Sequence, residues 1–354
     1  MSFPLVFIPA AGLGTRLTNN NFNLAKPLLS VGSKPLLFHI MSKYPKHTEF
    51  VIATGYQADF VRQVGDICSR HLSQKVTYTY TDSWRTEGMG LTNTILDSKK
   101  QLNRPFVFHA VDTLLNVTIP NFTKYNRDVL FVSRPTITST YRYVTNQLTW
   151  ARRKFIEGEN NVAYIGISFV ANFENFIDNL TAGKEFSQDG ETLGINLNQA
   201  KIIELDENSW IDCGVWEGVA LASKRLGSDF VVLPRSDEAI WKIESDVYKF
   251  HVDPNFISRR VKRGNSLLPF CPKTNLVSVN LYKYSFVPGK SLSKSNSETF
   301  ESFLSYCSDF WSKSYKGKYD RRQTEYFDFY KVKTEKRVQD FLSYTSIADY
   351  VTIN

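Results

Sequence analysis

The sequence predicts an α/β fold for roughly its first two thirds, built on a mixed, mostly parallel β-sheet. Short apolar runs alternate with helix-like segments, and the connections between them are brief and often contain glycine. The chain has 354 residues, of which 42% are hydrophobic, so it has enough material for two cores. We therefore expect two domains, residues 1–228 and residues 229–354, the second smaller and of α+β type.

The elements of the first domain follow from the spacing of their apolar residues. Residues 5–8 form a continuous apolar run before a glycine turn, as a buried strand does. We expect strands at 5–8, 50–53, 76–80 and 105–110, and helices at 34–44, 59–71 and 91–102. Ligands of parallel sheets bind beyond the carboxyl ends of the strands. Gly12, Gly55 and Asp112 follow expected strands and so indicate where a site lies.

After residue 226 the pattern changes. Residues 239–250 alternate around Glu244-Ser245, which is typical of an antiparallel hairpin. We expect a basic helix at 255–268, a strand at 281–286, an aromatic-rich helix at 300–311 and a polar loop at 313–323.

Charge and cysteine content limit the classes of partner. The formal net charge is +8, but the excess is spread along the chain, which favours a phosphorylated small molecule over nucleic acid. The four cysteines are scattered without a CxxC pair, which argues against a disulfide framework or a zinc site and favours a cytoplasmic location. The sequence contains no apolar run long enough to span a membrane, so we expect no membrane insertion.

The strongest chemical signal is the segment 12–17, Gly-Leu-Gly-Thr-Arg-Leu, followed by Lys26. Glycines after a strand let backbone N–H groups approach a phosphate closely. Arg16 and Lys26 add the positive charge that a triphosphate requires. A purely structural turn is the alternative. The segment is neither a P-loop nor a dinucleotide-binding fingerprint.

With its neighbours, this segment resembles the signature of the sugar-phosphate nucleotidyltransferases, the pyrophosphorylases that make nucleotide-activated sugars and phosphocholine. The resemblance runs through residues 9–17, 25–29, 32–36, 55–56, 87–91, 111–113 and 210–214. It covers roughly residues 3–225 and implies a Rossmann-like nucleotidyltransferase fold.

The resemblance also implies roles for individual residues. Arg16 and Lys26 would be the catalytic cations, and Asp112 and Asp212 would hold Mg²⁺. The nucleotide would be bound by Ala11, Gly12, Gly14, Thr15, Glu87, Gly88 and Gly90. The alternatives are a cap or turn role for each aspartate and a solvated loop charge for Glu87.

The acceptor site departs from the family pattern. The family carries a Glu-Lys-Pro or Glu-Lys-Gly element whose lysine contacts the sugar phosphate, whereas residues 151–158 here read Ala-Arg-Arg-Lys-Phe-Ile-Glu-Gly. Lys154 or one of the adjacent arginines would take that role. Gly166 lies in a segment similar to the strand that lines the family's acceptor pocket.

Residues 236–354 resemble the start of an aminoglycoside phosphotransferase or choline kinase domain, with Lys249 as the strand lysine that holds ATP phosphates. None of the five histidines is followed by Gly-Asp, so the catalytic loop of such a kinase is not recognisable. We expect no kinase activity. Two interpretations remain: a piece of a longer bifunctional protein that continues into a kinase lobe, which we favour, or a structural appendage.

Together these features predict a nucleotidyltransferase that joins an NTP to a phosphorylated sugar and releases pyrophosphate. The resemblance implies a role in nucleotide-sugar supply for a surface polysaccharide such as a capsule. Phosphocholine or a similar ester as acceptor and a catalytically silent nucleotide-binding protein remain the alternatives. The base, the sugar and the oligomeric state, including a homo-oligomer, are left open by the residues.

Overall fold

The computed structural model divides the chain into two compact units, Met1–Val287 and Pro288–Asn354. It describes residues 3–18, 23–85, 90–135, 137, 140–145, 147–154, 162–182, 194–227, 235–289, 292, 295–313 and 327–344. Among these residues, none of the helices combines the length and apolar character that a membrane crossing requires.

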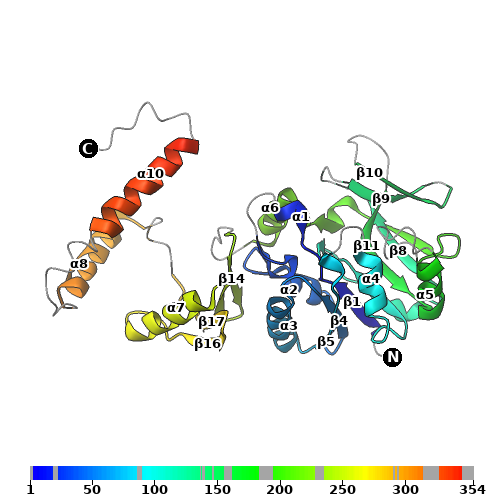
Figure 1. The fold of residues 1–354 in the computed structure, drawn as a ribbon, viewed down its shortest axis with the longest axis horizontal. Helices are drawn as coiled ribbons and strands as arrows, with labels where there is room; N and C mark the ends of the chain where they lie inside the picture. Colours follow the sequence, from blue (N-terminus) through cyan, green and yellow to red (C-terminus); the bar gives the residue numbers. More distant parts are fainter. Residues whose placement is uncertain are drawn as a thin grey trace. The chain divides into compact units, whose positions relative to one another are not determined.

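The first unit is built on one large mixed sheet (Figure 1). Its order is β10-β9-β11-β6-β1-β4-β5, and β8 pairs with both β11 and β12. The strands are β1 (Leu5–Pro9), β4 (Glu49–Thr54), β5 (Lys75–Tyr80), β6 (Phe106–His109), β8 (Val129–Ser133), β9 (Thr140–Val144), β10 (Trp150–Lys154), β11 (Ala163–Val170) and β12 (Lys201–Leu205).

The centre of this sheet is parallel: β6, β1, β4 and β5 run in one direction. Strand β11 is antiparallel to β6, β8 and β9 and so begins the antiparallel side. The predicted α/β class with parallel strands at its centre is confirmed.

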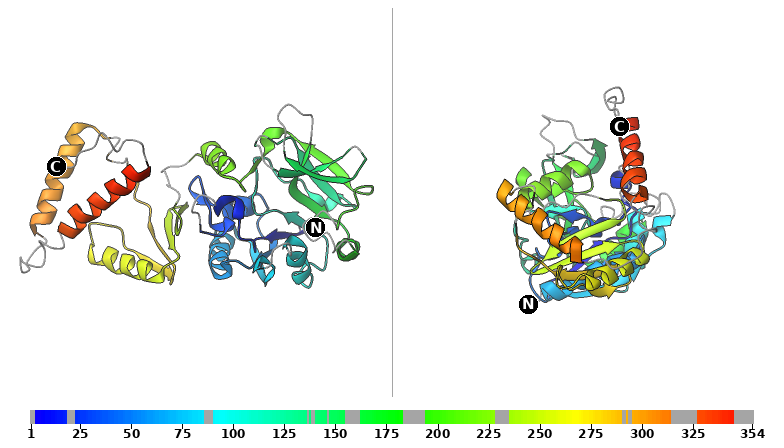
Figure 2. Two further views of the ribbon diagram at one scale, coloured as in Figure 1. Left: turned by 45° about the horizontal axis from the view of Figure 1, so that its top comes forward. Right: turned by 90° about the vertical axis from the view of Figure 1, so that its left-hand side faces the viewer.

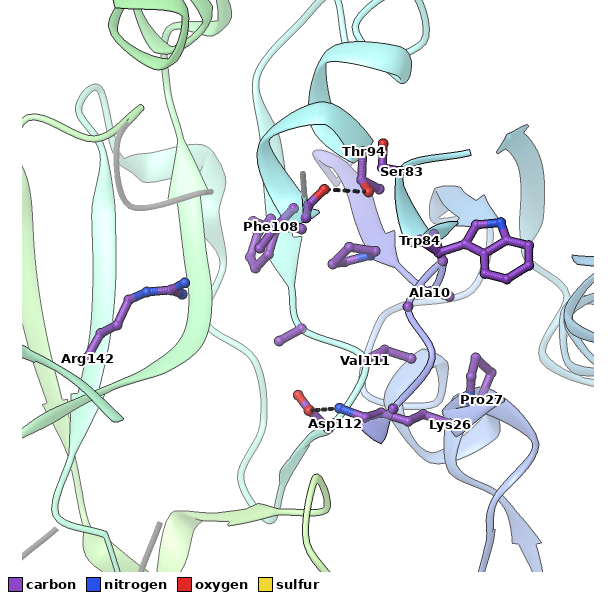
Figure 3. Close-up of a pocket in the computed structure, with 17 residues that line it drawn as sticks. Ala10, Lys26, Pro27, Ser83, Trp84, Thr94, Phe108, Val111, Asp112 and Arg142 are labelled. Atoms are coloured by element: carbon purple, nitrogen blue, oxygen red, sulfur yellow. Dashed lines mark hydrogen bonds and ion pairs between the residues drawn. The ribbon is translucent and has the colours of Figure 1, made fainter. Parts of the chain in front are cut away.

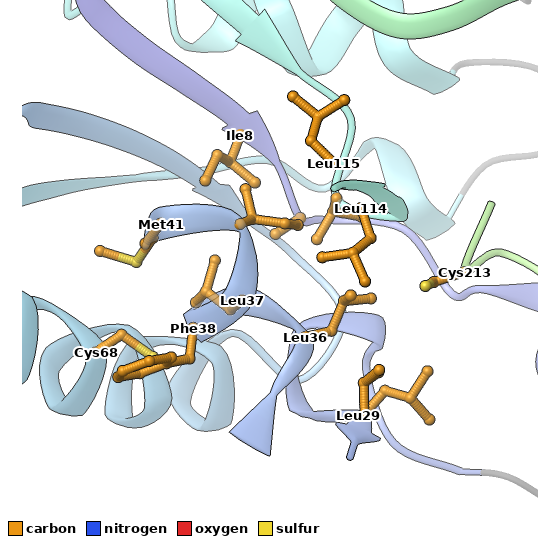
Figure 4. Packing of buried hydrophobic residues seen from close by; sticks show 14 of the residues in the cluster. Ile8, Leu29, Leu36, Leu37, Phe38, Met41, Cys68, Leu114, Leu115 and Cys213 are labelled. Carbon is orange, nitrogen blue, oxygen red and sulfur yellow. The ribbon is translucent and has the colours of Figure 1, made fainter. Parts of the chain in front are cut away.

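Helices cover both faces of the sheet. On one face, Val6 and Ile8 pack with residues of α2 (Leu36–Met41) and α3 (Ala58–Leu72). Figure 4 shows part of this cluster. On the other face, Leu5 and Phe7 pack with α4 (Gly90–Asp97) and α5 (Phe173–Ala182). Successive strand residues point to opposite faces, so β1 is buried by both layers.

The other elements that precede residue 228 are mostly short. They are α1 (Thr15–Thr18), η1 (Lys26–Leu28), β2 (Ser30–Val31), β3 (Lys34–Pro35), η2 (Ser83–Arg85), β7 (Thr113–Leu115), η3 (Phe122–Lys124), η5 (Glu207–Ser209), β13 (Trp210–Asp212) and α6 (Trp216–Leu226). The helix expected at 91–102 ends earlier, at Asp97. There the Ser98 hydroxyl donates to the Thr94 carbonyl at 2.8 Å and the backbone continues as turns.

A second, antiparallel sheet lies C-terminal to α6 and has the order β14-β15-β17-β16. Its elements are β14 (Glu238–Ile243), β15 (Asp246–His251), α7 (Pro254–Ser266), β16 (Asn275–Ser278) and β17 (Leu281–Ser285). Strands β14 and β15 form the predicted hairpin. Helix α7 begins after Asp253, whose carboxylate accepts from the Asn255 N–H at 2.8 Å.

This second sheet belongs to the first unit, which places the boundary differently from the expected one at 228/229. Trp241 is fully buried in the same hydrophobic cluster as α2 and α3, and its Nε1 donates to the Leu28 carbonyl at 3.2 Å. The Lys242 N–H donates to the Ser33 carbonyl at 2.6 Å. Whether this sheet is the small lobe of a kinase-like fold stays a prediction.

The second unit contains α8 (Ser297–Lys313), the π-helical turn η7 (Phe327–Val332) and α10 (Lys333–Tyr344). Figure 2 shows α8 in orange and α10 in red. The expected aromatic-rich helix at 300–311 is thus present. Most of the expected loop at 313–323 lies outside the described residues.

Candidate functional site

A cavity of about 310 Å³ lies beyond the carboxyl ends of β1 and β6 (Figure 3). It is lined by Pro9, Ala10, Ala11, Gly12, Gly14, Lys26, Pro27, Ser83, Trp84, Gly90, Leu91, Thr94, Phe108, Ala110, Val111, Asp112 and Arg142. This is the position at which ligands bind in parallel α/β sheets.

The turn after β1 presents backbone to this cavity. Ala11, Gly12 and Gly14 line it, and Thr15 begins α1. Gly14 has φ +69°, and a Cβ there would lie 3.1 Å from Cγ of Lys26. Glycine at position 14 therefore permits both the left-handed turn and the close approach of Lys26.

Four charged side chains converge at the edge of the cavity. Lys26 Nζ donates to Asp112 Oδ2 at 2.6 Å. Arg16 Nη2 donates to the same Asp112 oxygen at 3.1 Å, and Arg16 Nη1 lies 3.4 Å from Asp212 Oδ2. The structure thus brings together the two predicted cations and the two predicted metal-binding carboxylates.

The two aspartates are fixed by a short antiparallel ladder. Asp212 ends β13, where it is the register partner of Thr113 in β7. The Cys213 N–H donates to the Asp112 carbonyl at 2.7 Å, and the Gly214 N–H donates to Asp212 Oδ1 at 2.8 Å. A Cβ at Gly214 would lie 2.8 Å from both Asp112 Oδ2 and Asp212 Oδ1. The two carboxylates therefore converge on the space beside Gly214.

The charges within this cluster shift one another's pKa. Burial opposes ionisation of Asp112, but the Lys26 and Arg16 cations outweigh it and lower its pKa to about 2. Asp212 is only 7% exposed. Its pKa is raised by burial and by the neighbouring Asp112 charge, against the opposing effect of Arg16. For Arg16, burial lowers the pKa, but the two carboxylates outweigh it and raise the pKa above its usual value.

The remaining predicted residues are distributed as follows. Gly90 begins α4 and lines the cavity. Gly166 lies in β11 with φ +81°, and a Cβ there would lie 2.7 Å from Ala110 Cβ, so glycine allows β11 to pack behind a cavity residue. Lys154 is the last residue of β10, and its side chain lies outside the description. Glu87 and Gly88 lie outside the described residues.

Sequence reasoning missed two large side chains of the cavity wall, Trp84 and Arg142. Trp84 packs where Gly55 lacks a side chain: a Cβ at Gly55 would lie 2.6 Å from Trp84 Cδ1 and 2.9 Å from Ala11 Cβ. The position of Trp84 three residues before Glu87 was an available signal. For Arg142, the residues at 140–144 indicate a strand but not its place at the cavity; in the structure Tyr141 and Tyr143 are buried and Arg142 is not.

The described residues contain no group of three or more His, Cys, Asp and Glu side chains that would hold a metal. A divalent cation at Asp112 and Asp212 would thus need further oxygen atoms from a substrate, as Mg²⁺ does when it binds phosphates. The fold and the site therefore define an α/β protein with a site suited to phosphorylated ligands.

The comparisons with known proteins add a specific relationship over a short segment. Over 58 residues, the chain is 40% identical to the glucose-1-phosphate cytidylyltransferases of Salmonella typhimurium and Salmonella typhi. It is 34% identical over 58 residues to a probable glucose-1-phosphate cytidylyltransferase of Bacillus subtilis. Each match covers 16% of this chain, which spans 23% of the length of these relatives. No family model matches the chain.

Solved structures of nucleotidyltransferases are also similar to this chain. CTP:phosphocholine cytidylyltransferase from Streptococcus pneumoniae is 16% identical, covers 63% of this chain and 99% of its own, and has a TM-score of 0.47. A UDP-glucose pyrophosphorylase complexed with UDP-glucose is 18% identical, covers 64% of this chain and 98% of its own, and has a TM-score of 0.45. At these values, the structural similarities do not assign a function to the chain.

Proposed function

We propose that the first unit is a nucleotidyltransferase that joins an NTP to a sugar 1-phosphate and releases pyrophosphate. The observation that carries this proposal is the cluster of Arg16, Lys26, Asp112 and Asp212 beside the glycine turn and the cavity. Two cations and two carboxylates at a backbone phosphate cradle suit a reaction in which phosphate groups bind, react and leave.

The reaction is a displacement at phosphorus. A phosphate oxygen of the acceptor attacks the α-phosphorus of the NTP, and the bond from that phosphorus to the oxygen bridging to the β-phosphate breaks. Pyrophosphate leaves with the bonding electrons, so no protein nucleophile is required. The backbone of Ala11, Gly12 and Gly14 binds the triphosphate. Lys26 and Arg16 neutralise charge that develops on the α-phosphate and on the leaving pyrophosphate.

The charge balance of the cluster explains why we include Mg²⁺ in the proposal. The two cations are already neutralised by Asp112 and Asp212, whereas the two substrates bring several negative charges. When Mg²⁺ is bound at these carboxylates, it supplies the additional positive charge that two phosphorylated substrates need. Arg16 and Lys26 then exchange their carboxylate contacts for phosphate oxygens. Holding the carboxylates in place is the role of the β7–β13 ladder.

For the particular substrates, we propose CTP and glucose 1-phosphate. The 58-residue similarity to glucose-1-phosphate cytidylyltransferases supports this choice. We propose no phosphoryl-transfer activity for the sheet that contains Lys249. There, the Lys249 ammonium lies 3.2 Å from Glu238 Oε1 of the neighbouring strand β14, so its carboxylate partner comes from the hairpin and not from α7.

The test is pyrophosphate release in the presence of Mg²⁺. Each of CTP, UTP, dTTP, GTP and ATP is combined with glucose 1-phosphate, with other sugar 1-phosphates and with phosphocholine. We expect the CTP and glucose 1-phosphate pair to be productive and Asp112→Asn to abolish the release. A different productive pair would replace the substrates but keep the reaction. An inactive protein whose melting temperature responds to no NTP would refute the proposed function.

A further inference from the structure

Arg142 enters the cavity from the antiparallel side of the sheet. It is the central residue of β9, whose neighbours Tyr141 and Tyr143 are buried. Because side chains alternate along a strand, Arg142 points to the opposite face from the two tyrosines. Figure 3 shows its guanidinium directed into the cavity from the side opposite Trp84 and Pro27.

The charges that line the cavity are unevenly distributed. Among the described lining residues, three carry charge: Lys26, Asp112 and Arg142. Figure 3 shows Lys26 and Asp112 next to each other, with Arg142 entering the cavity from another side. A second anionic group bound next to the triphosphate would therefore meet a separate cation there.

We propose that Arg142 binds the phosphate of the acceptor and aims one of its oxygens at the NTP. This inference rests on the proposed function, which requires two phosphorylated substrates in one cavity. A guanidinium is charged at all relevant pH values, and its planar fork binds two oxygens of a phosphate at once. Such a contact offsets repulsion between the substrates and restricts rotation of the attacking group.

The competing residue is Lys154, which, with the adjacent arginines as alternatives, is the residue that the family resemblance implies. Both residues belong to the β9–β10 hairpin, in which Arg142 is the register partner of Arg152 and Lys154 is that of Thr140. Among the hairpin side chains that the structure describes, that of Arg142 lines the cavity, whereas the side chain of Lys154 lies outside the description. The two assignments make different predictions for single substitutions, so one set of variants separates them.

The experiment measures the KM of each substrate separately. Pyrophosphate release is followed with glucose 1-phosphate varied at saturating CTP, and then with CTP varied at saturating glucose 1-phosphate. For Arg142→Ala we expect a KM for glucose 1-phosphate at least ~10-fold higher, with the KM for CTP within about twofold of the unsubstituted protein. Arg142→Lys should recover part of the loss, because it keeps the charge but not the fork.

Two further variants complete the set. Arg134→Ala is the matched control, since Arg134 is a partly exposed arginine of the same unit whose guanidinium lies 3.4 Å from Glu204. It should leave both KM values unchanged. Lys154→Ala should change the KM for glucose 1-phosphate less than Arg142→Ala does.

Three outcomes would overturn the inference while leaving the reaction intact: an unchanged acceptor KM in Arg142→Ala, an equal rise in both KM values, or a larger effect from Lys154→Ala.

If the unsubstituted protein releases no pyrophosphate, the proposed function fails. Titration calorimetry with glucose 1-phosphate and with glucose, each in the presence of CTP, then decides the role of Arg142. Binding of the phosphate ester alone, lost in Arg142→Ala, would support that role. No binding, or binding unaffected by the substitution, would overturn it.

Discussion

The Lys26 ammonium lies 2.6 Å from Asp112 Oδ2, although 86 positions separate the two residues in the chain. Lys26 begins η1, which comes after the glycine turn that follows β1. Asp112 lies shortly after the end of β6, the strand that pairs with β1. Both side chains are largely buried, at 15% and 17% exposure. The pair joins the two segments that form the edge of the cavity, so a change in either residue alters the charge of the other's surroundings.

Replacing Lys26 by methionine keeps the length of the side chain and removes its charge. We expect the turnover number to fall about 10²- to 10³-fold, the size of effect that loss of one transition-state contact produces. The pKa of Asp112 should rise, because its principal cation partner is gone. Pyrophosphate-release kinetics measure the first effect. Lys75→Met is the control, since Lys75 is 75% exposed and lies 3.8 Å from Glu49. Near-normal turnover in Lys26→Met would contradict the assigned role.

The lowered pKa of Asp112 predicts an acid-dependent loss of stability. Its folded-state pKa is about 2 and its ordinary value is 3.8, so the folded state binds this proton less readily than the unfolded chain. The contribution is fully present above about pH 4 and is lost as the pH falls toward 2. It amounts to about 2 kcal/mol at most.

Urea unfolding at pH 7 and at pH 3 measures this contribution. The free energy of unfolding should decrease less between these two pH values in Asp112→Asn than in the unsubstituted protein. Equal decreases in the two proteins would show that the ion pairs of Asp112 do not contribute in this way. Asp66→Asn is a suitable comparison, because Asp66 lies on α3 away from the cluster.

Gly14→Ala tests the close approach between the glycine turn and Lys26. Two costs are expected: strain of about 1 kcal/mol from an alanine at φ +69°, and displacement of Lys26, whose Cγ would lie 3.1 Å from the new Cβ. Gly227→Ala is a control for backbone strain without the displacement, since no heavy atom would lie within 4 Å of its Cβ. With φ +66° and ψ 169°, Gly227 has a backbone conformation that costs alanine about 1–3 kcal/mol, at least as much as at position 14. Urea unfolding and pyrophosphate release should show that both variants lose stability and that only Gly14→Ala loses activity. Loss of activity in both would indicate a general effect of strain.

The parallel core could be predicted from sequence because its signals are local, whereas the roles expected for Arg16, Lys26, Asp112 and Asp212 came from the family resemblance. Each expected strand is a short apolar run that ends in a turn, and Asp112 lies close behind such a run. Arg142 could not be assigned to the site in this way. Its place in the cavity depends on how β9 pairs with β10 and β11, which are antiparallel contacts between segments with no shared local pattern.

The extent of the first compact unit could not be predicted from the sequence for a related reason. A change in pattern after residue 226 indicated new elements, and the inference that they form a separate domain followed from the pattern alone. Burial of Trp241 in the cluster that also contains residues of α2 and α3 is a tertiary feature, as is the hydrogen bond from its indole to Leu28. Neither contact leaves a periodic signal in the sequence. The change of pattern after residue 226 therefore marked the start of a new sheet, whereas one hydrophobic core contains residues from both sides of that change.

The position of this boundary leads to the last prediction. A chain ending at residue 228 would lose Trp241 and Phe250, and Phe250 packs on Phe60 of α3 with ring centroids 4.9 Å apart. We expect that chain to lack a cooperative unfolding transition, whereas a chain ending at residue 287 should unfold cooperatively and keep its pyrophosphate release.

Single substitutions test the same contact without truncation. Trp241→Ala should cost about 3–5 kcal/mol in urea unfolding, because it empties a fully buried site. It also leaves the Leu28 carbonyl, next to Lys26 and Pro27 in η1, without its indole donor. Phe300→Ala on α8 is the control, since Phe300 is 46% exposed and its loss should cost less than about 0.5 kcal/mol. A stable, active chain of residues 1–228, or a Trp241→Ala variant as stable as the control, would support the boundary that the sequence pattern indicated. Because η1 carries Lys26, a drop in turnover alongside the drop in stability would show that the second sheet supports the site as well as the core.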